Sequence, residues 1–162
     1  MNTHYRELVD RLRNELVDLE HIVDRAQRSW TQAQGASRDQ EAYLDSVALN
    51  LHSFYSALER LFQLIAKHVD GSFPEGGNWH RDLILQMADD QREARPAVIG
   101  HDSASGLDEF RRFRHLVRNV YTINLRPDKI SGLMSALPGL WKELRAELRA
   151  FADFIEELTE AK

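Results

Sequence analysis

Residues 110–121 read Phe-Arg-Arg-Phe-Arg-His-Leu-Val-Arg-Asn-Val-Tyr, and this stretch has the periodicity of an amphipathic helix. On a helix turning about 100° per residue, its apolar side chains fall on one arc. Its arginines, His115 and Asn119 fall on the other arc, with Tyr121 at the boundary. The formal net charge of the chain is -5, so this local positive charge indicates an anion-binding site, and guanidinium groups can bind phosphate bidentately. The alternative is a solvated arginine face paired with nearby acids.

The same helical period covers most of the chain, with apolar residues at steps of three and four. It predicts long helices over 3–34 and 38–69, a short one over 79–89, a cationic one over 105–121 with Ser105 as its cap, and a last helical region from about 126 to the end. Pro127 suits the first turn of that last region, whereas Pro138 should kink or split it. No strand alternation of useful length is present. The sequence therefore predicts an all-α fold, an antiparallel helical bundle of about five helices.

The composition is that of an ordinary globular protein, with 162 residues, 43% hydrophobic and 29% charged, which predicts a single domain over 1–162. The absence of cysteine excludes disulfides and cysteine-based zinc sites. No apolar run approaches the ~20 residues that cross a bilayer, and the amphipathic N-terminus lacks a secretory stretch. We therefore expect a cytoplasmic protein with no membrane partner. A pI near 5.8 argues against duplex DNA binding over a broad basic face, but it allows a small RNA site.

Several catalytic motifs are missing from the sequence. The seven histidines form no His-Glu-x-x-His pair, and there is neither a phosphate-binding P-loop nor a Gly-x-Ser-x-Gly elbow. We therefore expect no metal and no cofactor. Two polar features are open to two interpretations each. Trp79 either anchors the short helix or joins His80 in a functional group, and Glu59 is either a bundle-edge residue or a buried partner of an arginine.

Three blocks of the chain resemble the HEPN superfamily, and most closely the HepT-like toxins. They are residues 52–62 (HSFYSALERLF), 79–83 (WHRDL) and 112–121, and the resemblance covers roughly residues 45–158. The family signature is an arginine, a polar residue, three further residues and a histidine, often with a tyrosine two residues after the histidine. Arg114, His115 and Tyr121 match the arginine, the polar residue and the tyrosine. Asn119 stands at the position of the catalytic histidine of the family.

The resemblance implies an all-α bundle that forms a homodimer, with the two signature helices facing each other across a cleft. It implies a metal-independent endoribonuclease toxin in which a ribose 2′-hydroxyl attacks the adjacent phosphate. A partner nucleotidyltransferase antitoxin of the MNT type would neutralise it, in some cases by transferring AMP to the signature tyrosine, here Tyr121. The residues implied to take part are catalytic Arg114, His115, Asn119 and Tyr121, and RNA-binding Arg111, Arg118 and His80.

Asn119 leaves the chemistry open, because an amide cannot shuttle a proton at neutral pH and a histidine can. His115 or His80 could supply the base, a histidine could act across the dimer, or cleavage could be lost while binding is kept. The alternative function is a non-catalytic helical partner, or substrate-binding subunit, of a nucleotidyltransferase that modifies Tyr121. A third possibility is a structural bundle with no ligand site.

Overall fold

The computed structural model describes residues 2–35, 38–91, 93–119 and 127–161. The helices of these ranges are α1 (Asn2–Gly35), α2 (Gln40–Ile65), a π-helical turn η1 (Ala66–Asp70), α3 (Trp79–Ala88), α4 (His101–Asn119) and α5 (Pro127–Glu160). In the described ranges the one bridge of β type joins Gln91 to Arg95, and no strand forms. This confirms the all-α bundle that the helical period predicts.

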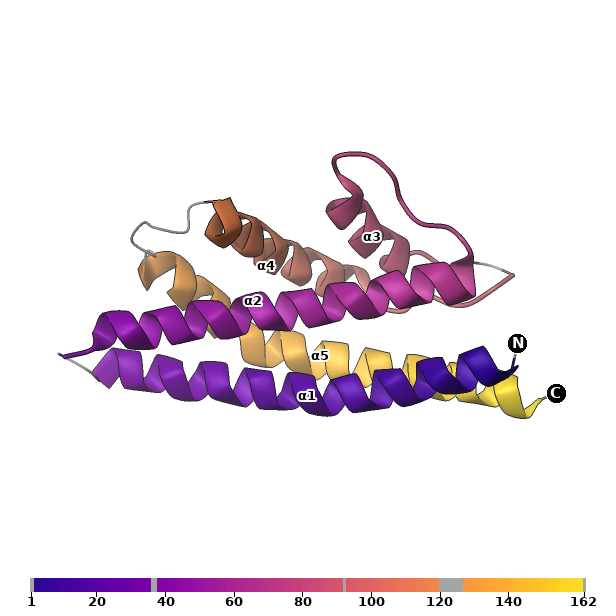
Figure 1. Ribbon diagram of the computed structural model, residues 1–162, viewed down its shortest axis with the longest axis horizontal. Coiled ribbons are helices and arrows are strands. Elements are labelled where there is room, and N and C mark those ends of the chain that lie inside the picture. Colours follow the sequence, from indigo (N-terminus) through magenta and orange to yellow (C-terminus); the bar gives the residue numbers. More distant parts are fainter. Residues whose placement is uncertain (1, 36–37, 92, 120–126, 162) are drawn as a thin grey trace.

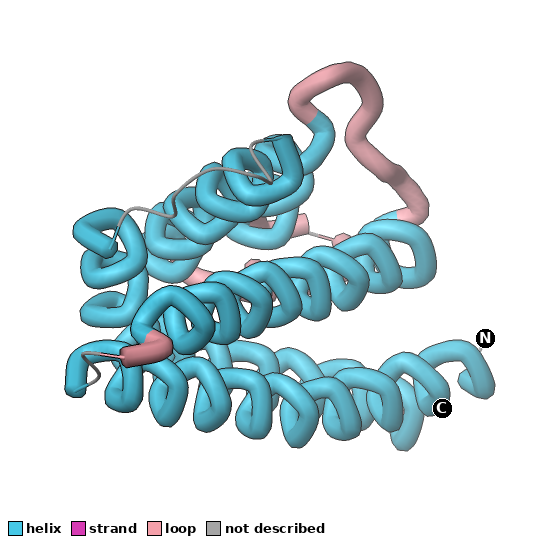
Figure 2. The backbone as a smooth tube through the Cα atoms, turned by 60° about the vertical axis from the view of Figure 1, so that its left-hand side comes forward, coloured by secondary structure: helices cyan, strands magenta, loops and turns pink. Residues whose placement is uncertain are grey.

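The three long helices run side by side along the molecule, and the two shorter ones cover one side of α2 (Figure 1). α1 packs along both α2 and α5 and is antiparallel to them, so the two termini lie at the same end. α4 contacts α2, α3 and α5. The loop before α3 arches away from the bundle (Figure 2). In the described part of the chain, no helix is long and apolar enough to cross a membrane.

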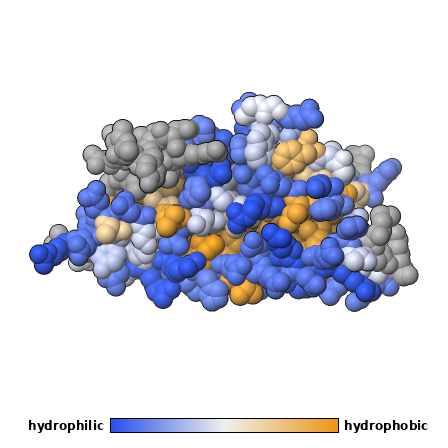
Figure 3. Space-filling model, in the orientation of Figure 1, coloured by the Kyte–Doolittle hydropathy of each residue, from blue (hydrophilic) through white to orange (hydrophobic). Residues whose placement is uncertain are grey.

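The apolar positions predicted by the helical period form one buried core. Leu12 on α1, Leu58 on α2 and Leu144 on α5 are fully shielded from solvent. α4 approaches α5 closely at Gly106, where an added Cβ would lie 3.0 Å from a methyl carbon of Leu140. On the face shown in Figure 3, hydrophilic residues cover most of the surface, and hydrophobic ones are visible in a few patches along the length of the molecule.

α4 begins at His101, four residues before the helix predicted from a cap at Ser105, so that boundary prediction was wrong. The reason lies on α5. The carboxylate of Glu147 accepts hydrogen bonds from the Gly100 amide and the Ser103 hydroxyl, each at 2.5 Å. A carboxylate at a helix N-terminus binds free amide groups and opposes the positive end of the helix dipole. This distant cap therefore replaces the local one.

α5 is continuous from Pro127, its first residue, to Glu160, and it contains Pro138. The prediction that Pro127 lies in the first turn is confirmed, because proline fits where no intrahelical amide bond is required. The alternative that Pro138 splits the region is wrong. Leu137 and Trp141, which flank the proline, are both buried, so core contacts hold the helix on either side of it.

Candidate functional site

One turn of α2 carries three polar side chains toward α3 and α4: Tyr55, Ser56 and Glu59. Tyr55 and Glu59 are only 1% and 6% exposed. A buried carboxylate is costly unless other groups donate hydrogen bonds to it. Glu59 is therefore informative, because the residues that satisfy it define a polar cluster inside an otherwise apolar interface.

His80, in the first turn of α3, is one partner of Glu59. Its Nδ1 atom lies 2.8 Å from Oε2 of Glu59. A carboxylate can only accept, so Nδ1 carries the proton and Nε2 is the nitrogen available for proton exchange. The imidazole also stacks on the indole of Trp79, with ring centroids 3.6 Å apart, and its side chain is 29% exposed. His80 is thus an oriented imidazole that solvent can reach.

Arg114, on α4, is attached to the same turn of α2. Its Nε donates a hydrogen bond of 3.0 Å to the Ser56 hydroxyl, and its Cζ lies 6.0 Å from the centroid of the Tyr55 ring. A guanidinium over an aromatic face gains cation–π stabilisation. Ser56 and Glu59 are three residues apart, a helix rise of about 4.5 Å. Arg114 and His80 are therefore fastened to neighbouring positions of one helix turn.

Tyr55 lies between these groups and stays neutral. Burial, then the charge of Glu59 and its hydrogen bond, raise the pKa of the Tyr55 hydroxyl above its ordinary value, while the charges of Arg111 and Arg114 act in the opposite direction. A phenol with a raised pKa keeps its proton at neutral pH. Tyr55 therefore helps to satisfy Glu59 and does not serve as a base.

Arg111 and Arg112, the other arginines of α4 whose side chains are described, pair with acids along their own helix. Arg111 Nε lies 2.7 Å from Asp108, and Arg112, which is 61% exposed, lies 3.0 Å from Asp108 and 3.5 Å from Glu109. The alternative of a solvated arginine face thus describes Arg112 well. Arg114 differs, because the hydrogen bond that it makes within the described part of the chain is to a neutral hydroxyl. Its charge is the better placed of the three to bind an external anion.

The structure brings together only some of the residues predicted from the sequence. Arg111, Arg114 and His80 lie around Tyr55 and Glu59, whereas His115 is exposed on α4. The backbone of Arg118 and Asn119 continues α4, but their side chains lie outside the described part, as does all of Tyr121.

The pairing of Glu59 was the feature that sequence reasoning missed. The simpler interpretation placed it at the bundle edge, and the functional alternative gave it an arginine partner. It is buried, and its ion-pair partner is His80. A signal was present in the spacing, because Tyr55 and Glu59 are four residues apart and therefore lie on one helix face.

Comparison with known proteins places these features in a family. The family model described as HepT-like protein matches residues 46–155, which include the α2 turn, His80 and Arg114. No curated protein and no solved structure matches the chain. The family match covers about two thirds of the sequence. The chain therefore belongs to the HepT-like proteins of the HEPN superfamily.

Proposed function

We propose that this HepT-like protein is a toxin that cleaves RNA without a metal ion and is neutralised by a nucleotidyltransferase antitoxin of the MNT type. The observation that carries the proposal is the attachment of Arg114 and His80 to one turn of α2. It attaches a guanidinium and an imidazole oriented by a carboxylate to residues three apart on one helix. Phosphoryl transfer at RNA requires these two functions, a positive charge on the phosphate and a group that exchanges protons near neutral pH.

In the proposed reaction, Nε2 of His80 accepts the proton of a ribose 2′-hydroxyl. The 2′-oxygen bonds to the adjacent phosphorus, and the bond from phosphorus to the 5′-oxygen of the next nucleotide breaks. That oxygen takes up a proton from water, and His80 returns its own proton to solvent, so the products end in a 2′,3′-cyclic phosphate and a 5′-hydroxyl. Arg114 stabilises the charge that develops on the phosphate oxygens. Asn119 would donate a hydrogen bond to the phosphate rather than exchange a proton.

The proposed assembly is a homodimer of a single 1–162 domain, with the α4 helices of two copies facing one cleft. The support is charge. Arg114 and Arg118 on two facing helices would repel each other without an anion or acids between them. An RNA phosphate satisfies that requirement. The antitoxin would act in the cytoplasm by transferring AMP to Tyr121.

Asn119 also supports a second candidate function. Where the family has its catalytic histidine, this chain has an amide, which binds but does not exchange protons. A protein with this change could act as a non-catalytic partner of the nucleotidyltransferase that is modified at Tyr121. The two functions differ in one measurable property, which is RNA breakdown.

Expression of the chain with and without a nucleotidyltransferase encoded beside it tests the proposal. We expect growth arrest and RNA breakdown when the chain is expressed alone, and rescue by the nucleotidyltransferase. The purified protein should cleave RNA in the presence of EDTA. Arg114→Ala should lower the cleavage rate about 10²–10³-fold, and Arg114→Lys should also be poor, because a point charge lacks the bidentate fork.

Arg112→Ala is the matched control, since Arg112 lies on the same helix but is exposed and paired with acids. It should cleave RNA as the wild type does. Equal losses in Arg112→Ala and Arg114→Ala would show that only general positive charge matters. A wild-type protein that neither arrests growth nor cleaves RNA, but binds the nucleotidyltransferase, would support the second function instead.

A further inference from the structure

A hollow lies beside the His80–Trp79 stack, on the side where α2 passes into η1. Gln63, Lys67, Gly71, Ser72, Phe73 and Trp79 line this aromatic hollow, whose volume is about 530 Å³. The Phe73 and Trp79 rings have centroids 5.4 Å apart and are tilted by 45°. Phe73 is 44% exposed, so its ring offers an open face to a ligand. Trp79 therefore contacts both His80 and the aromatic hollow.

Two polar side chains of the aromatic hollow, those of Gln63 and Lys67, have no partners in the described part of the chain. Neither the Gln63 amide nor the Lys67 ammonium makes a hydrogen bond or ion pair there. An amide can both donate to and accept from the edge of a nucleobase, and an ammonium can bind a phosphate. Together with two aromatic rings, these are the groups that bind single-stranded nucleic acid.

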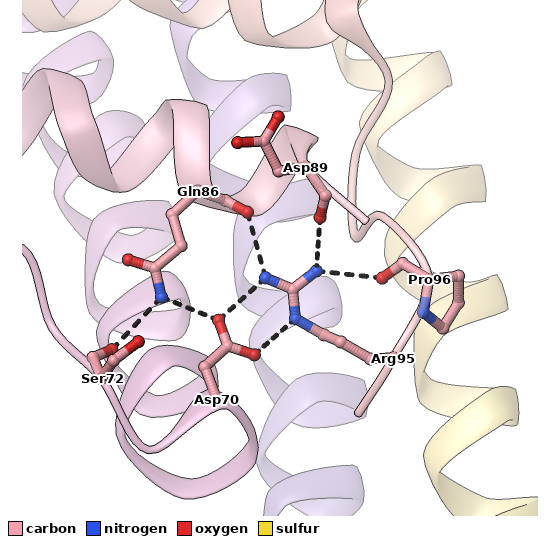
Figure 4. A network of polar contacts seen from close by, with 6 residues as sticks. All are labelled: Asp70, Ser72, Gln86, Asp89, Arg95 and Pro96. Carbon is pink, nitrogen blue, oxygen red and sulfur yellow. Dashed lines mark hydrogen bonds and ion pairs between the residues drawn. The ribbon is translucent and has the colours of Figure 1, made fainter. Parts of the chain in front are cut away.

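A buried ionic network fixes the start of the loop that carries Phe73. Arg95 donates from Nε and Nη2 to both carboxylate oxygens of Asp70, at 2.6 and 2.8 Å (Figure 4). Gln86 of α3 donates to Asp70 at 2.7 Å and to the Ser72 carbonyl at 3.2 Å. Arg95 and Asp70 side chains are essentially fully buried. The loop is therefore anchored to α3 immediately before Phe73, which pre-organises the aromatic hollow.

We infer that the aromatic hollow binds one unpaired base of an RNA strand whose neighbouring phosphate lies near His80 and Arg114. The base stacks on the exposed ring of Phe73, which Trp79 supports from the other side of their contact. Gln63 binds the edge of the base, while Lys67 binds the backbone. The ligand is single-stranded RNA, because a base inside a duplex has no free face to stack. The position of the cut phosphate rests on the proposed function, whereas the binding of a base rests on the aromatic hollow itself.

The test uses a short single-stranded RNA that is 2′-O-methylated throughout, so that it cannot be cleaved by 2′-hydroxyl attack. Its affinity is measured with each base removed in turn, for the wild type and for Phe73→Ala. Removal of one particular base should weaken wild-type binding about 5- to 150-fold, the usual effect of losing one stacked base. The same removal should have no further effect on Phe73→Ala. Lys67→Ala should lower the salt dependence of binding by about 0.7 in the log–log slope.

Leu85→Ala is the control, because Leu85 is also on the surface, at 47% exposed, but does not line the aromatic hollow. It should bind the RNA as the wild type does. Two results would overturn the inference. One is that removing any base weakens binding equally in the wild type and in Phe73→Ala, and the other is that Phe73→Ala binds the RNA with wild-type affinity. If the second result came with a change of oligomeric state in Phe73→Ala, the aromatic hollow would be an interface between copies.

This outcome is independent of cleavage. If Phe73→Ala loses the effect of the particular base on RNA affinity and the wild type does not cleave RNA, the base-binding site is supported and the nuclease function is contradicted. Cleavage that depends on Arg114, with normal RNA binding by Phe73→Ala, would keep the nuclease and reject the base-binding site.

Discussion

The Nδ1 atom of His80 lies 2.8 Å from the Oε2 atom of Glu59, and this contact joins α3 to the buried face of α2. The Glu59 side chain is 7% exposed, whereas that of His80 is 29% exposed. A shielded carboxylate thus orients an imidazole that faces solvent. This arrangement favours one tautomer and keeps the ring in place for proton exchange at Nε2.

Replacing His80 by alanine should therefore remove the proposed base. We expect His80→Ala to lower the rate of RNA cleavage by about 10²–10⁴-fold, the usual contribution of a positioned acid or base. Glu59→Gln keeps a side chain of the same shape but removes the charge, so it should lower the rate as well. The measurement is single-turnover cleavage of a defined RNA.

His115→Ala is the comparison variant, since His115 is the other histidine that the sequence offers near Arg114. It should cleave RNA nearly as fast as the wild type. The opposite result, a harmless His80→Ala and an inactive His115→Ala, would make His115 the base.

Asn119→His restores the family signature at one position of α4. We expect ribonuclease activity to rise, because a histidine at this position can exchange protons at neutral pH and an amide cannot. The assay is cleavage by the purified variant beside the wild type. If the variant loses an activity that the wild type has, Asn119 is itself a working part of the site. Activity in neither form, without growth arrest, would support the non-catalytic partner.

Tyr55 predicts how the stability of the fold depends on pH. Its folded-state pKa is raised above the unfolded value, so the folded state holds the phenolic proton to higher pH. The contribution of this proton to the free energy of unfolding is therefore complete below the unfolded pKa of about 10. As pH rises above that value the contribution is lost, by up to about 1.4 kcal/mol per pH unit.

Tyr55→Phe should remove this loss at high pH. At neutral pH it should lower the free energy of unfolding by about 1–3 kcal/mol, because Glu59 loses a buried hydrogen-bond donor. Urea unfolding at pH values on both sides of 10 measures both effects. Tyr43→Phe, at a partly buried tyrosine of the same helix, should keep the decline. A decline of unchanged steepness in Tyr55→Phe would show that other groups cause it.

Removing one partner of the buried Asp70–Arg95 pair should lower the free energy of unfolding much more than removing one partner of an ion pair at the surface. Asp70→Ala leaves the Arg95 charge buried without its carboxylate and should lower the free energy of unfolding by about 3–5 kcal/mol. Asp153→Ala, which removes an exposed partner of Arg13, should cost about 0–1 kcal/mol. Chemical denaturation gives both values. Similar costs for the two variants would mean that the burial of Arg95 contributes little.

Much of the fold could be predicted from the sequence, because helical periodicity is a local property. The apolar stripe of each long helix and the place of Pro127 in the first turn of α5 follow from residues a few positions apart. The candidate arginines were found in the same way, since Arg111 and Arg114 lie on the polar arc of one amphipathic helix. The three blocks that resemble HepT-like proteins are likewise local stretches of sequence.

Only the tertiary structure decided which polar residues meet. α4 begins at His101 because Glu147, 47 residues beyond Gly100, caps it, and no local pattern contains that contact. Glu59 lies on a mostly apolar helix face, where the sequence alone does not show whether a carboxylate is buried. It is buried because α3 packs against α2 and places His80 within hydrogen-bond distance of it. The physical reason is the same in both cases. Local periodicity determines which face of a helix turns inward. A buried charge or a free helix end costs free energy, and that cost is offset by a partner from a distant part of the chain, which only tertiary packing brings into contact.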